Sequence, residues 1–403
     1  MKILLLCKKF PYPLKDGESI AVHTLSLALS QLGCEISLLA MNTSKHFYQK
    51  TELPAEAAHF EQVRTVPVDN RIKASAAFFN LFSEESYHIA RFVSADFQAA
   101  LQQMLQETDY DVVQLETLYL APYIATIRKY SQARISMRAH NVEHEIWERI
   151  SSHTTNGIKR WYLKHLTQKL RRFEVNSLQQ YDMLLPITDR DLRYFRQLGF
   201  DKPAVVTPIG IRAEEFRQAR ELCPSKPSIS FIGSLDWMPN LEGLQWFIQK
   251  VWPALHQQFP ALEFHIAGRN TPANLMQLKK PNVFVHGEVP ESAPFIDAHC
   301  MMVVPLLSGS GMRAKILEGM ALGKVVVSTS IGLEGISAEH KKNVLVANTV
   351  DQFVDAIAFA LHSKPRLNQM ARDAQSFVFD EYESVNIAKR VHQAYSKQFA
   401  ASV

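Results

Sequence analysis

The chain has 403 residues, which at about 150 to 200 residues per domain predicts two domains, each with its own core. Its composition, 47% hydrophobic and 21% charged, is that of a folded soluble chain and excludes fibrous or wholly disordered structure. The net charge of +4, from 44 basic and 40 acidic residues, is too dilute to indicate nucleic acid as a main partner.

Short apolar runs alternate with helical patterns along the first half of the chain. The run at residues 2–7 is followed by a loop that continues through Gly17, and then by a helical pattern from Ile20 to Leu32 that Gly33 ends. Further β-branched or aliphatic runs occupy residues 35–41, 61–68, 111–116, 134–140, 183–188 and 204–210. Such apolar runs, mostly separated by helices, predict strands buried on both faces of a mainly parallel sheet.

The second half restarts the same alternation after a polar and proline-rich boundary. Its strands are predicted at 228–233, 262–268, 283–287, 300–306, 324–329 and 343–347. We therefore predict an α/β protein with two Rossmann-like, doubly wound domains, residues 1–210 and 228–378, joined by a linker at 211–227. Because ligands of such sheets bind at the carboxyl ends of the strands, we expect the site in a central cleft that the domains face.

The cysteines and the apolar stretches indicate a reducing cytoplasm. Cys7, Cys34, Cys223 and Cys300 have no paired spacing, so neither a zinc knuckle nor a disulfide framework is expected. The apolar run at 3–7 is too short for a signal-peptide core, and no stretch approaches the about 20 apolar residues that span a bilayer.

Residues 159–172 form a basic segment with two possible roles. They include six Lys or Arg and no acid, interleaved with Trp161, Tyr162 and leucines. This pattern is compatible with peripheral contact with an anionic membrane at its inner face. It is equally compatible with a helix whose apolar face packs on the core and whose basic face is solvated.

The sharpest motif is Ser-Gly-Ser-Gly-Met-Arg-Ala-Lys-Ile-Leu-Glu at 308–318, which joins a predicted strand to a helix. Gly309 and Gly311 let a ligand approach the backbone, and the first N–H groups of the helix attract an anion. Arg313 and Lys315 place cations where the helix dipole disfavours them, which suggests that a phosphate offsets the cost. Glu318 is placed to accept hydrogen bonds from a ribose. The alternative is an ordinary amphipathic helix with solvated charges, and no P-loop or strand-bound GxGxxG is present.

Other candidate residues have equally ordinary interpretations. His140 ends an apolar strand, where a histidine faces a ligand or makes structural hydrogen bonds. Trp237, Trp246 and Trp252 fall at largely helical spacing and are expected in the core. Asp189 and Asp191 have the spacing of a metal-binding pair but begin a predicted helix, so no metal site is expected.

Together these segments resemble the retaining GT-B glycosyltransferases of family 4, including their "glycosyl transferases group 1" C-terminal domain. The resemblance covers nearly the whole chain. In the C-terminal half it rests on residues 231–240, 266–270, 287–289 and 311–318. In the N-terminal half it rests on Gly17, 138–143 and 182–191. It implies that residues 379–403 form a helix that crosses back to the N-terminal domain.

The resemblance also implies roles for individual residues. Glu318 matches the second glutamate of the E-x7-E motif, which holds the donor's ribose. The remaining implied donor-binding residues are Gly233 and Ser234 at the phosphates, Arg269, Val289 beside the base, Gly309, Gly311, and the cations Arg313 and Lys315. On the catalytic side, His140 corresponds to a histidine that faces the donor sugar and Gly17 to the loop where donor and acceptor meet. Ser310 stands where the first glutamate of the motif is expected, as in a similar branch with Gly-x-Arg-x-Lys.

The implied function is transfer of a hexose, with retention, from a nucleoside diphosphate sugar to an acceptor hydroxyl. The acceptor would be a saccharide or lipid-linked molecule in bacterial surface polysaccharide, lipopolysaccharide or glycolipid assembly, and no metal or other cofactor would be needed. Two alternatives stay open. One is a nucleotide-sugar epimerase of the same fold, and the other, motivated by Ser310, is a non-catalytic nucleotide-sugar-binding scaffold subunit.

Overall fold

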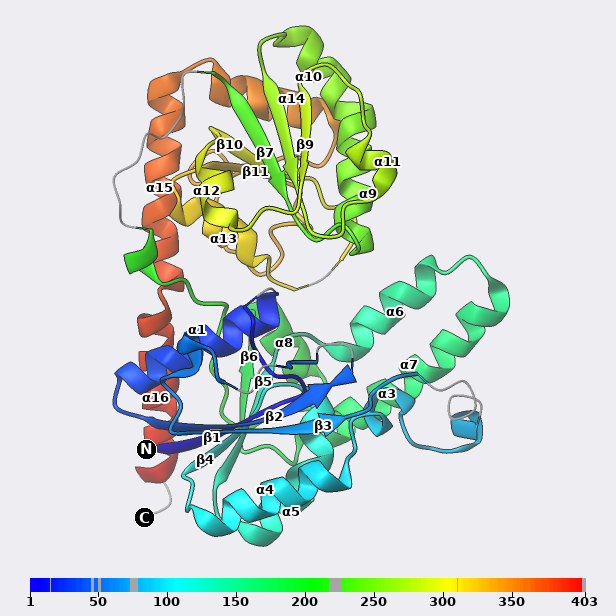
Figure 1. Ribbon diagram of the computed structural model, residues 1–403, viewed down its shortest axis with the longest axis vertical. Coiled ribbons are helices and arrows are strands. Elements are labelled where there is room, and N and C mark those ends of the chain that lie inside the picture. Colours follow the sequence, from blue (N-terminus) through cyan, green and yellow to red (C-terminus); the bar gives the residue numbers. More distant parts are fainter. Residues whose placement is uncertain are drawn as a thin grey trace. The chain divides into compact units, whose positions relative to one another are not determined.

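The computed structural model describes residues 1–14, 16–44, 47–49, 52–72, 79–216, 226–309 and 311–400 (Figure 1). Most of the predicted linker lies outside the described residues, namely residues 217–225, which include Cys223. Ser310 lies outside them as well. The contacts divide the chain into two units, one of Met1–Gly210 with Ser384–Val403 and the other of Ile211–Glu383.

The first unit is built on a parallel sheet which, in the part of the chain described, has six strands in the order β3-β2-β1-β4-β5-β6. The strands are β1 (Lys2–Cys7), β2 (Glu35–Thr43), β3 (Gln62–Val68), β4 (Val112–Leu115), β5 (Arg134–Ala139) and β6 (Met183–Pro186). Both faces of the sheet are buried: on β1, Leu4 and Leu6 join one hydrophobic core, and Ile3, Leu5 and Cys7 join the other.

Residues 204–210, which we predicted as a strand, do not form one. The Val205 N–H donates to the Leu184 carbonyl at 3.0 Å and the Thr207 N–H to the Pro186 carbonyl at 2.7 Å. The segment therefore follows β6, but it adds only an isolated bridge at Ala204. Pro186, the last residue of β6, has no N–H to donate to the Val205 carbonyl, so a regular ladder cannot extend along this segment.

Helices cover both faces of the first sheet (Figure 1). On one face lie α1 (Gly17–Gln31) and α16 (Ser384–Ala400), and on the other α4 (Ala95–Glu107) and α5 (Ile124–Tyr130). The Tyr395 hydroxyl of α16 donates to Gln114 Oε1 at 2.6 Å and lies 3.0 Å from Ser136 Oγ, which ties the last helix to β4 and β5. The remaining helical elements are η2 (Ala55–Ala57), η3 (Asn80–Phe82), α3 (Tyr87–Ala90), η4 (Leu118–Tyr123), α6 (Glu143–His153), α7 (Gly157–Leu178) and α8 (Asp189–Gln197).

The second unit repeats this architecture. Over its described residues the strand order is β12-β11-β10-β7-β8-β9, all parallel. The strands are β7 (Ser228–Ile232), β8 (Glu263–Ala267), β9 (Val283–Gly287), β10 (Met301–Val304), β11 (Val325–Ser328) and β12 (Leu345–Val346). The predicted fold class, two Rossmann-like doubly wound α/β units, is confirmed.

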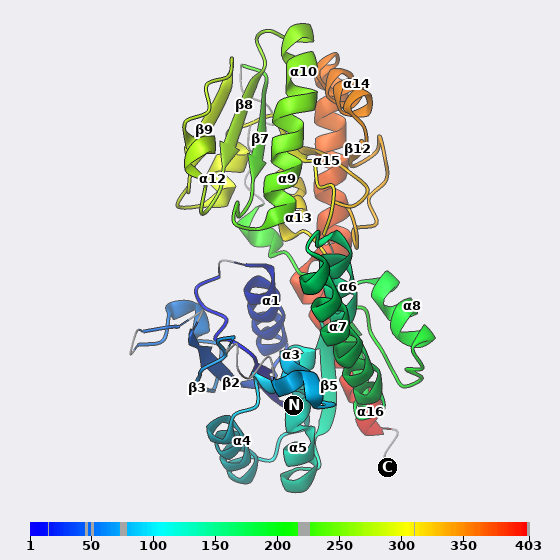
Figure 2. The same cartoon turned by 90° about the vertical axis from the view of Figure 1, so that its right-hand side faces the viewer.

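Helices cover both faces of the second sheet as well (Figure 2). One face carries α9 (Met238–Trp246), η6 (Phe247–Val251), α10 (Trp252–Gln258) and α14 (Val350–Leu361), and the other carries α12 (Ser292–Asp297), α13 (Ala314–Ala321) and α15 (Lys364–Tyr382). The short η5 (Ala213–Glu215) and α11 (Ala273–Met276) complete the unit. Among the helices described in the whole chain, none is both long and apolar enough to cross a membrane.

The described cysteines include both free thiols and a disulfide-bonded residue. Cys7 and Cys34 are buried thiols, and burial raises the pKa of Cys7 well above its usual range. Cys300, in contrast, is disulfide-bonded. From the sequence we expected no disulfide framework and did not foresee this bond, because spacing along the chain does not show which cysteines the fold brings close together.

Candidate functional site

The loops that follow β7, β8, β9 and β10 lie at one edge of the second sheet, because these strands are parallel. The predicted donor-binding residues are in these loops or in α13. Gly233 and Ser234 follow β7, Arg269 follows β8, Val289 follows β9, Gly309, Gly311 and Arg313 follow β10, and Lys315 and Glu318 are in α13. Ser310 lies in the same loop by sequence but is not among the described residues.

Ser234 connects the loops after β7 and β8. Its Oγ donates to Asp236 Oδ1 at 2.5 Å and accepts from Arg269 Nη2 at 3.3 Å. The hydrogen bond from Ser234 lowers the pKa of Asp236, so this carboxyl stays ionised beside the cation. Gly268 permits the approach of the two loops, because a Cβ there would collide with the Gly233 carbonyl oxygen. A larger residue at position 268 would therefore separate Ser234 from Arg269.

The glycine loop after β10 is folded around Arg313. Gly309 and Gly311 adopt φ values of 115° and 83°, in the region that favours glycine. Arg313 Nη1 donates to the Gly311 carbonyl at 2.6 Å, and its Cζ lies 5.1 Å from the centroid of the Trp237 ring. Trp237, which we expected in the core, is 40% exposed. That expectation is wrong because Trp237 is the N-cap residue of α9 and not part of its buried face.

Two charged residues follow on α13. Burial lowers the pKa of the half-buried Lys315. The negative charge of Glu318 raises this pKa and the positive charge of Arg269 lowers it, but the net shift is downward. An anion bound beside Lys315 would therefore favour its charged form. Glu318 Oε1 accepts a hydrogen bond from Ser292 Oγ at 2.5 Å, which fixes one oxygen of the carboxylate. Val289, half-buried between β9 and α12, contributes apolar surface.

The first unit has its own polar cluster at the carboxyl ends of β4 and β5. His140 follows β5, and its Nε2 lies 2.9 Å from Oε2 of Glu116, which follows β4 and is 1% exposed. Arg138, fully buried, lies 3.7 Å from the same oxygen. Burial raises the pKa of Glu116, but Arg138 and the hydrogen bond with His140 outweigh it and lower the pKa. An ionised Glu116 accepts the proton of Nε2, so Nδ1 is the basic nitrogen of the neutral imidazole.

A second acid–base group lies at the same edge. Lys8 follows β1. Its Nζ lies 3.1 Å from Glu18 Oε2 and 4.7 Å from the centroid of the Tyr119 ring. The Tyr119 hydroxyl donates to Glu143 Oε2 at 2.9 Å. Burial raises the pKa of Glu143 to about 7, with Lys8 opposing the shift and Glu174 adding to it. A carboxyl with this pKa exchanges a proton readily at neutral pH.

Gly17 is the first residue of α1. Asp16 caps this helix by accepting the Ser19 N–H at 3.0 Å, and Lys9 Nζ lies 2.7 Å from the same carboxylate. A Cβ at Gly17 would meet only Ile209 Cδ1, at an ordinary 3.8 Å. The local packing therefore does not itself require glycine at this position.

The predicted site residues did not include Glu116, Arg138, Lys8 or Glu143, although Arg138 and Glu143 lie in the segment 138–143 on which the resemblance rests. A signal existed for two of them, since Arg138 is a charge within an apolar strand and Glu116 ends one. Such charges are rarely buried without a partner. The proximity of Lys8 to Glu143 had no comparable signal, because the two residues are far apart in sequence.

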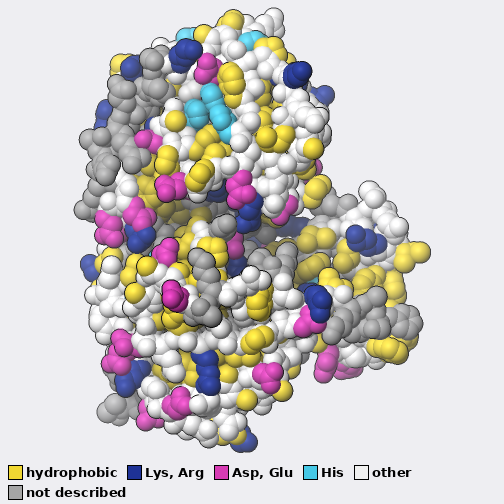
Figure 3. Space-filling model, in the orientation of Figure 1, with side chains coloured by type: hydrophobic (Ala, Val, Ile, Leu, Met, Phe, Trp, Pro, Cys, Tyr) yellow, Lys and Arg dark blue, Asp and Glu magenta, His cyan; other side chains and the backbone are white. Residues whose placement is uncertain are grey.

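Histidine side chains gather on one face of the second unit, as Figure 3 shows. His265 Nδ1 lies 3.0 Å from His286 Nε2, and the rings of His265 and His299 stack with centroids 4.3 Å apart. Burial lowers the pKa of His299 to about 3. Within the ranges that the structure describes, no three or more His, Cys, Asp or Glu side chains are grouped so as to hold a metal ion.

Comparison with solved structures identifies the fold as that of the GT-B glycosyltransferases. Sucrose-phosphate synthase from Thermosynechococcus elongatus has a TM-score of 0.73 and 15% identity, with 100% of both chains covered. Anabaena HepE in complex with UDP-glucose has a TM-score of 0.65 and 14% identity, covering 98% of this chain and 100% of that one. A variant of S. aureus TarM, in complex with UDP, fondaparinux and α-GlcNAc-glycerol, has a TM-score of 0.67 and 10% identity, covering 98% and 99%.

Residues 226–363 match the family model Glycosyl transferases group 1, so the second unit contains a glycosyltransferase domain of this type. The chain as a whole is also similar to an uncharacterized 44.6 kDa protein in the cps region of Klebsiella pneumoniae. The identity is 22% over 400 residues, which cover 96% of this chain and 97% of that protein.

Proposed function

We propose that the chain transfers a hexose, with retention at the anomeric carbon, from a nucleoside diphosphate sugar to an acceptor hydroxyl. The observation that carries this proposal is the edge of the second sheet. There Arg269, Arg313 and Lys315 accompany a glycine loop at the start of α13, with Glu318 one turn further on. The match of this region to a glycosyltransferase family model supports the same interpretation.

The proposed chemistry depends on stabilising the leaving diphosphate. Arg313, Lys315 and the first N–H groups of α13 oppose the negative charge that develops as the sugar departs. Glu318, with one oxygen held by Ser292, accepts the ribose hydroxyls with its other oxygen. We propose that no metal or other cofactor is needed for this step. UDP-hexoses are the first donors to try, because HepE was solved with UDP-glucose and TarM with UDP.

The first unit is proposed to supply groups that face the sugar and the acceptor. His140, oriented by Glu116, presents Nδ1 as a hydrogen-bond acceptor for a sugar hydroxyl. Gly17 lies at the start of α1, at the edge of the sheet where β1 ends. Ser310 would occupy the position beside the donor hexose where relatives of family 4 have a glutamate.

The proposed pathway is assembly of a bacterial surface polysaccharide, lipopolysaccharide or glycolipid, which the relative in a cps region supports. The acceptor is then a saccharide or a lipid-linked molecule. Peripheral contact with an anionic membrane at its inner face, through residues 159–172, is part of this proposal. Trp161 is 62% exposed in α7, and Figure 3 shows hydrophobic and basic side chains together on the α6–α7 hairpin. Lys169 does not contribute, because it is buried and donates to the Asn80 carbonyl at 2.5 Å.

Two other functions keep a specific observation in their favour. Glu143 and His140 are acid–base groups of the kind that a nucleotide-sugar epimerase requires. Ser310, in place of a glutamate, favours a non-catalytic binding subunit.

Turnover of a panel of nucleotide sugars, with and without saccharide acceptors and in excess EDTA, distinguishes the three. Release of nucleoside diphosphate that depends on an acceptor and persists in EDTA supports the proposal. Conversion of the donor without acceptor indicates an epimerase, and binding without turnover indicates a scaffold. Activity that requires magnesium contradicts the proposal that the leaving diphosphate is stabilised without a metal.

A further inference from the structure

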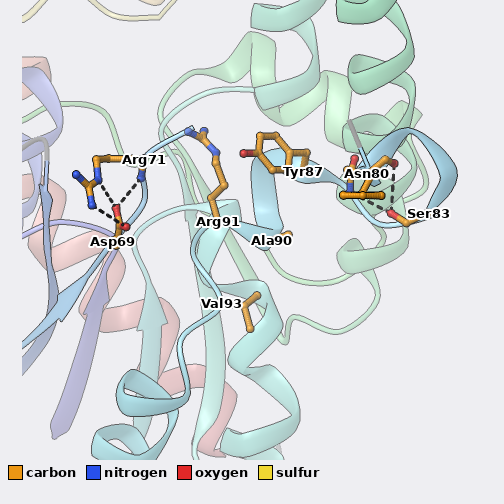
Figure 4. A pocket seen from close by; sticks show the side chains of 9 residues that line it. Asp69, Arg71, Asn80, Ser83, Tyr87, Ala90, Arg91 and Val93 are labelled. Carbon is orange, nitrogen blue, oxygen red and sulfur yellow. Dashed lines mark hydrogen bonds and ion pairs between the residues drawn. The ribbon is translucent and has the colours of Figure 1, made fainter. Parts of the chain in front are cut away.

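The first unit contains an open cavity of about 460 Å³ where β3 ends. Its lining begins at Asp69 and Arg71, directly after β3, and continues through η3 to Tyr87 and Arg91 at α3 (Figure 4). The wall combines aromatic rings, an amide and two arginines. Side chains of these kinds pack against sugar rings and bind oxyanions.

The two arginines of the cavity differ in their charge balance. Arg71 is paired with Asp69, with Nε 2.8 Å from Oδ1 and Nη2 3.1 Å from Oδ2. Arg91 has no acidic partner among the described residues, and its Nη1 donates to the Asn70 carbonyl at 3.3 Å. A half-buried guanidinium without an acidic partner among the described residues keeps its attraction for an anion.

The orientation of Arg91 is fixed by aromatic rings. Its Cζ lies 5.7 Å from the centroid of the Tyr87 ring and 5.8 Å from that of Phe92. In Figure 4 the Tyr87 hydroxyl points toward the side of the cavity on which this guanidinium lies. A guanidinium held in this way loses little side-chain entropy when it binds an oxyanion.

Polar atoms beside the cavity are left unsatisfied by the described part of the chain. Asn80 Oδ1 and Arg91 Nε are buried without a hydrogen-bond partner. Asn80 is 8% exposed, and its Nδ2 donates to Ser83 Oγ and to the Glu85 carbonyl, both at 3.0 Å. A buried polar atom without a partner destabilises the folded chain, so this arrangement points to a ligand that both accepts and donates hydrogen bonds.

The cavity lies at the same edge of the first sheet as the acid–base groups described above. The ring of Phe92, which follows Arg91, lies 4.9 Å from that of Tyr119, whose hydroxyl donates to Glu143. One layer of aromatic rings therefore connects the surroundings of Arg91 with those of Glu143.

We propose that this cavity binds an anionic group, a carboxylate or a phosphate, carried by the acceptor saccharide, and that Arg91 selects for the charge. That the ligand is an acceptor rests on the proposed function, whereas binding of the anion does not depend on the second unit. A planar guanidinium forms two parallel hydrogen bonds with an oxyanion, and a neutral sugar cannot replace that contact.

Calorimetric titration of the full chain tests the inference with three probes: methyl β-D-glucuronide, glucose 6-phosphate and methyl β-D-glucoside. At least one anionic probe should bind about tenfold more tightly than the neutral glucoside, which corresponds to about 1.4 kcal/mol. Whichever of the two anionic probes binds more tightly shows whether the cavity prefers a carboxylate or a phosphate.

Three variants locate the preference. Arg91→Gln should abolish it, while Arg91→Lys should keep part of it, because lysine keeps the charge but not the planar pair of donors. Arg64→Gln is the matched control. It removes one positive charge from β3 outside the cavity, where Arg64 Nη2 donates to Gln103 Oε1 at 2.6 Å, and it should leave the preference unchanged. Circular dichroism of each variant verifies that it is folded.

Equal affinity for all three probes, no detectable binding of either anion at millimolar concentration, or a preference that survives Arg91→Gln would overturn the inference. Turnover of nucleotide sugars is measured on the same samples. If the charge preference depends on Arg91 while no sugar is transferred under any condition, the proposed function fails and the anion site stands. If transfer occurs but the anion preference is absent, only the anion site fails.

Discussion

The pH dependence of unfolding should report the protonation of Glu143. This residue is 7% exposed, and burial raises its pKa from the ordinary 4.5 to about 7. Because the pKa is higher in the folded chain than in the unfolded chain, the unfolded state releases the proton first as pH rises. The contribution of protonated Glu143 to the free energy of unfolding is therefore fully present below pH 4.5, and it is lost progressively as the pH rises to about 7.

Glu143→Gln removes this titration and keeps an oxygen that accepts the Tyr119 hydroxyl. The difference between 7 and 4.5 is 2.5, which at 1.36 kcal/mol per pH unit gives a loss of about 3.4 kcal/mol at alkaline pH. Between pH 5 and pH 8 the variant should therefore gain about 2.5 kcal/mol in unfolding free energy relative to the parent chain.

Urea unfolding of both proteins at several pH values measures this difference. Glu148→Gln is the matched control, because Glu148 is an exposed carboxyl of the same helix, α6. Its difference from the parent chain should not change with pH by a comparable amount. If the Glu143→Gln difference is flat, or if the variant is the less stable protein at pH 8, then Glu143 is ionised and paired with Lys8 in the folded chain, and the reasoning is wrong.

Four further substitutions test other parts of the structure. Glu318→Ala should weaken donor binding by about 1.5 to 3 kcal/mol with little change in melting temperature, and a collapsed melting temperature with unchanged binding would make Glu318 structural. Arg313→Ala and Lys315→Ala should weaken a nucleoside diphosphate and its sugar equally, as measured by calorimetry, but not the bare nucleoside; equal losses for the nucleoside would contradict their assignment to the phosphates. Tyr395→Phe leaves the buried Gln114 Oε1 without its donor and should lower the unfolding free energy of the first unit by about 1 to 3 kcal/mol, which urea unfolding would detect.

Most of the fold could be predicted because buried parallel strands are continuous apolar runs that helices separate. The prediction failed at two places where the residue pattern was that of a buried element but the local backbone was not. Residues 204–210 are apolar enough for a strand, but the neighbouring strand β6 ends at Pro186, which lacks the N–H that a ladder needs there. Trp237 has helical spacing to Trp246 but precedes the helix, and there its ring packs against Arg313.

The local geometry of the candidate site follows from the sequence where its residues are contiguous. The glycine loop and α13 place Gly309, Arg313 and Glu318 within ten positions, so their arrangement follows from local structure. The cluster of Glu116 and His140 forms because two strands are neighbours in the sheet, and the register that pairs them is set by packing over the whole domain. A single sequence carries no direct record of that register.

The assignment of α16 to the first core has a consequence for biosynthesis. Ile387, Val391 and Tyr395 complete a hydrophobic core whose other members come mainly from the first 70 residues and from β4 and β6. On the ribosome these early residues emerge long before their last partners, whereas the residues of the second unit form one continuous stretch. The N-terminal unit must therefore wait, with one apolar face uncovered, until residues 384–400 have been translated. Premature termination anywhere before Ser384 would leave that face exposed to chaperones and proteases, and a fragment ending at Gly210 should aggregate unless the final helix is supplied in trans.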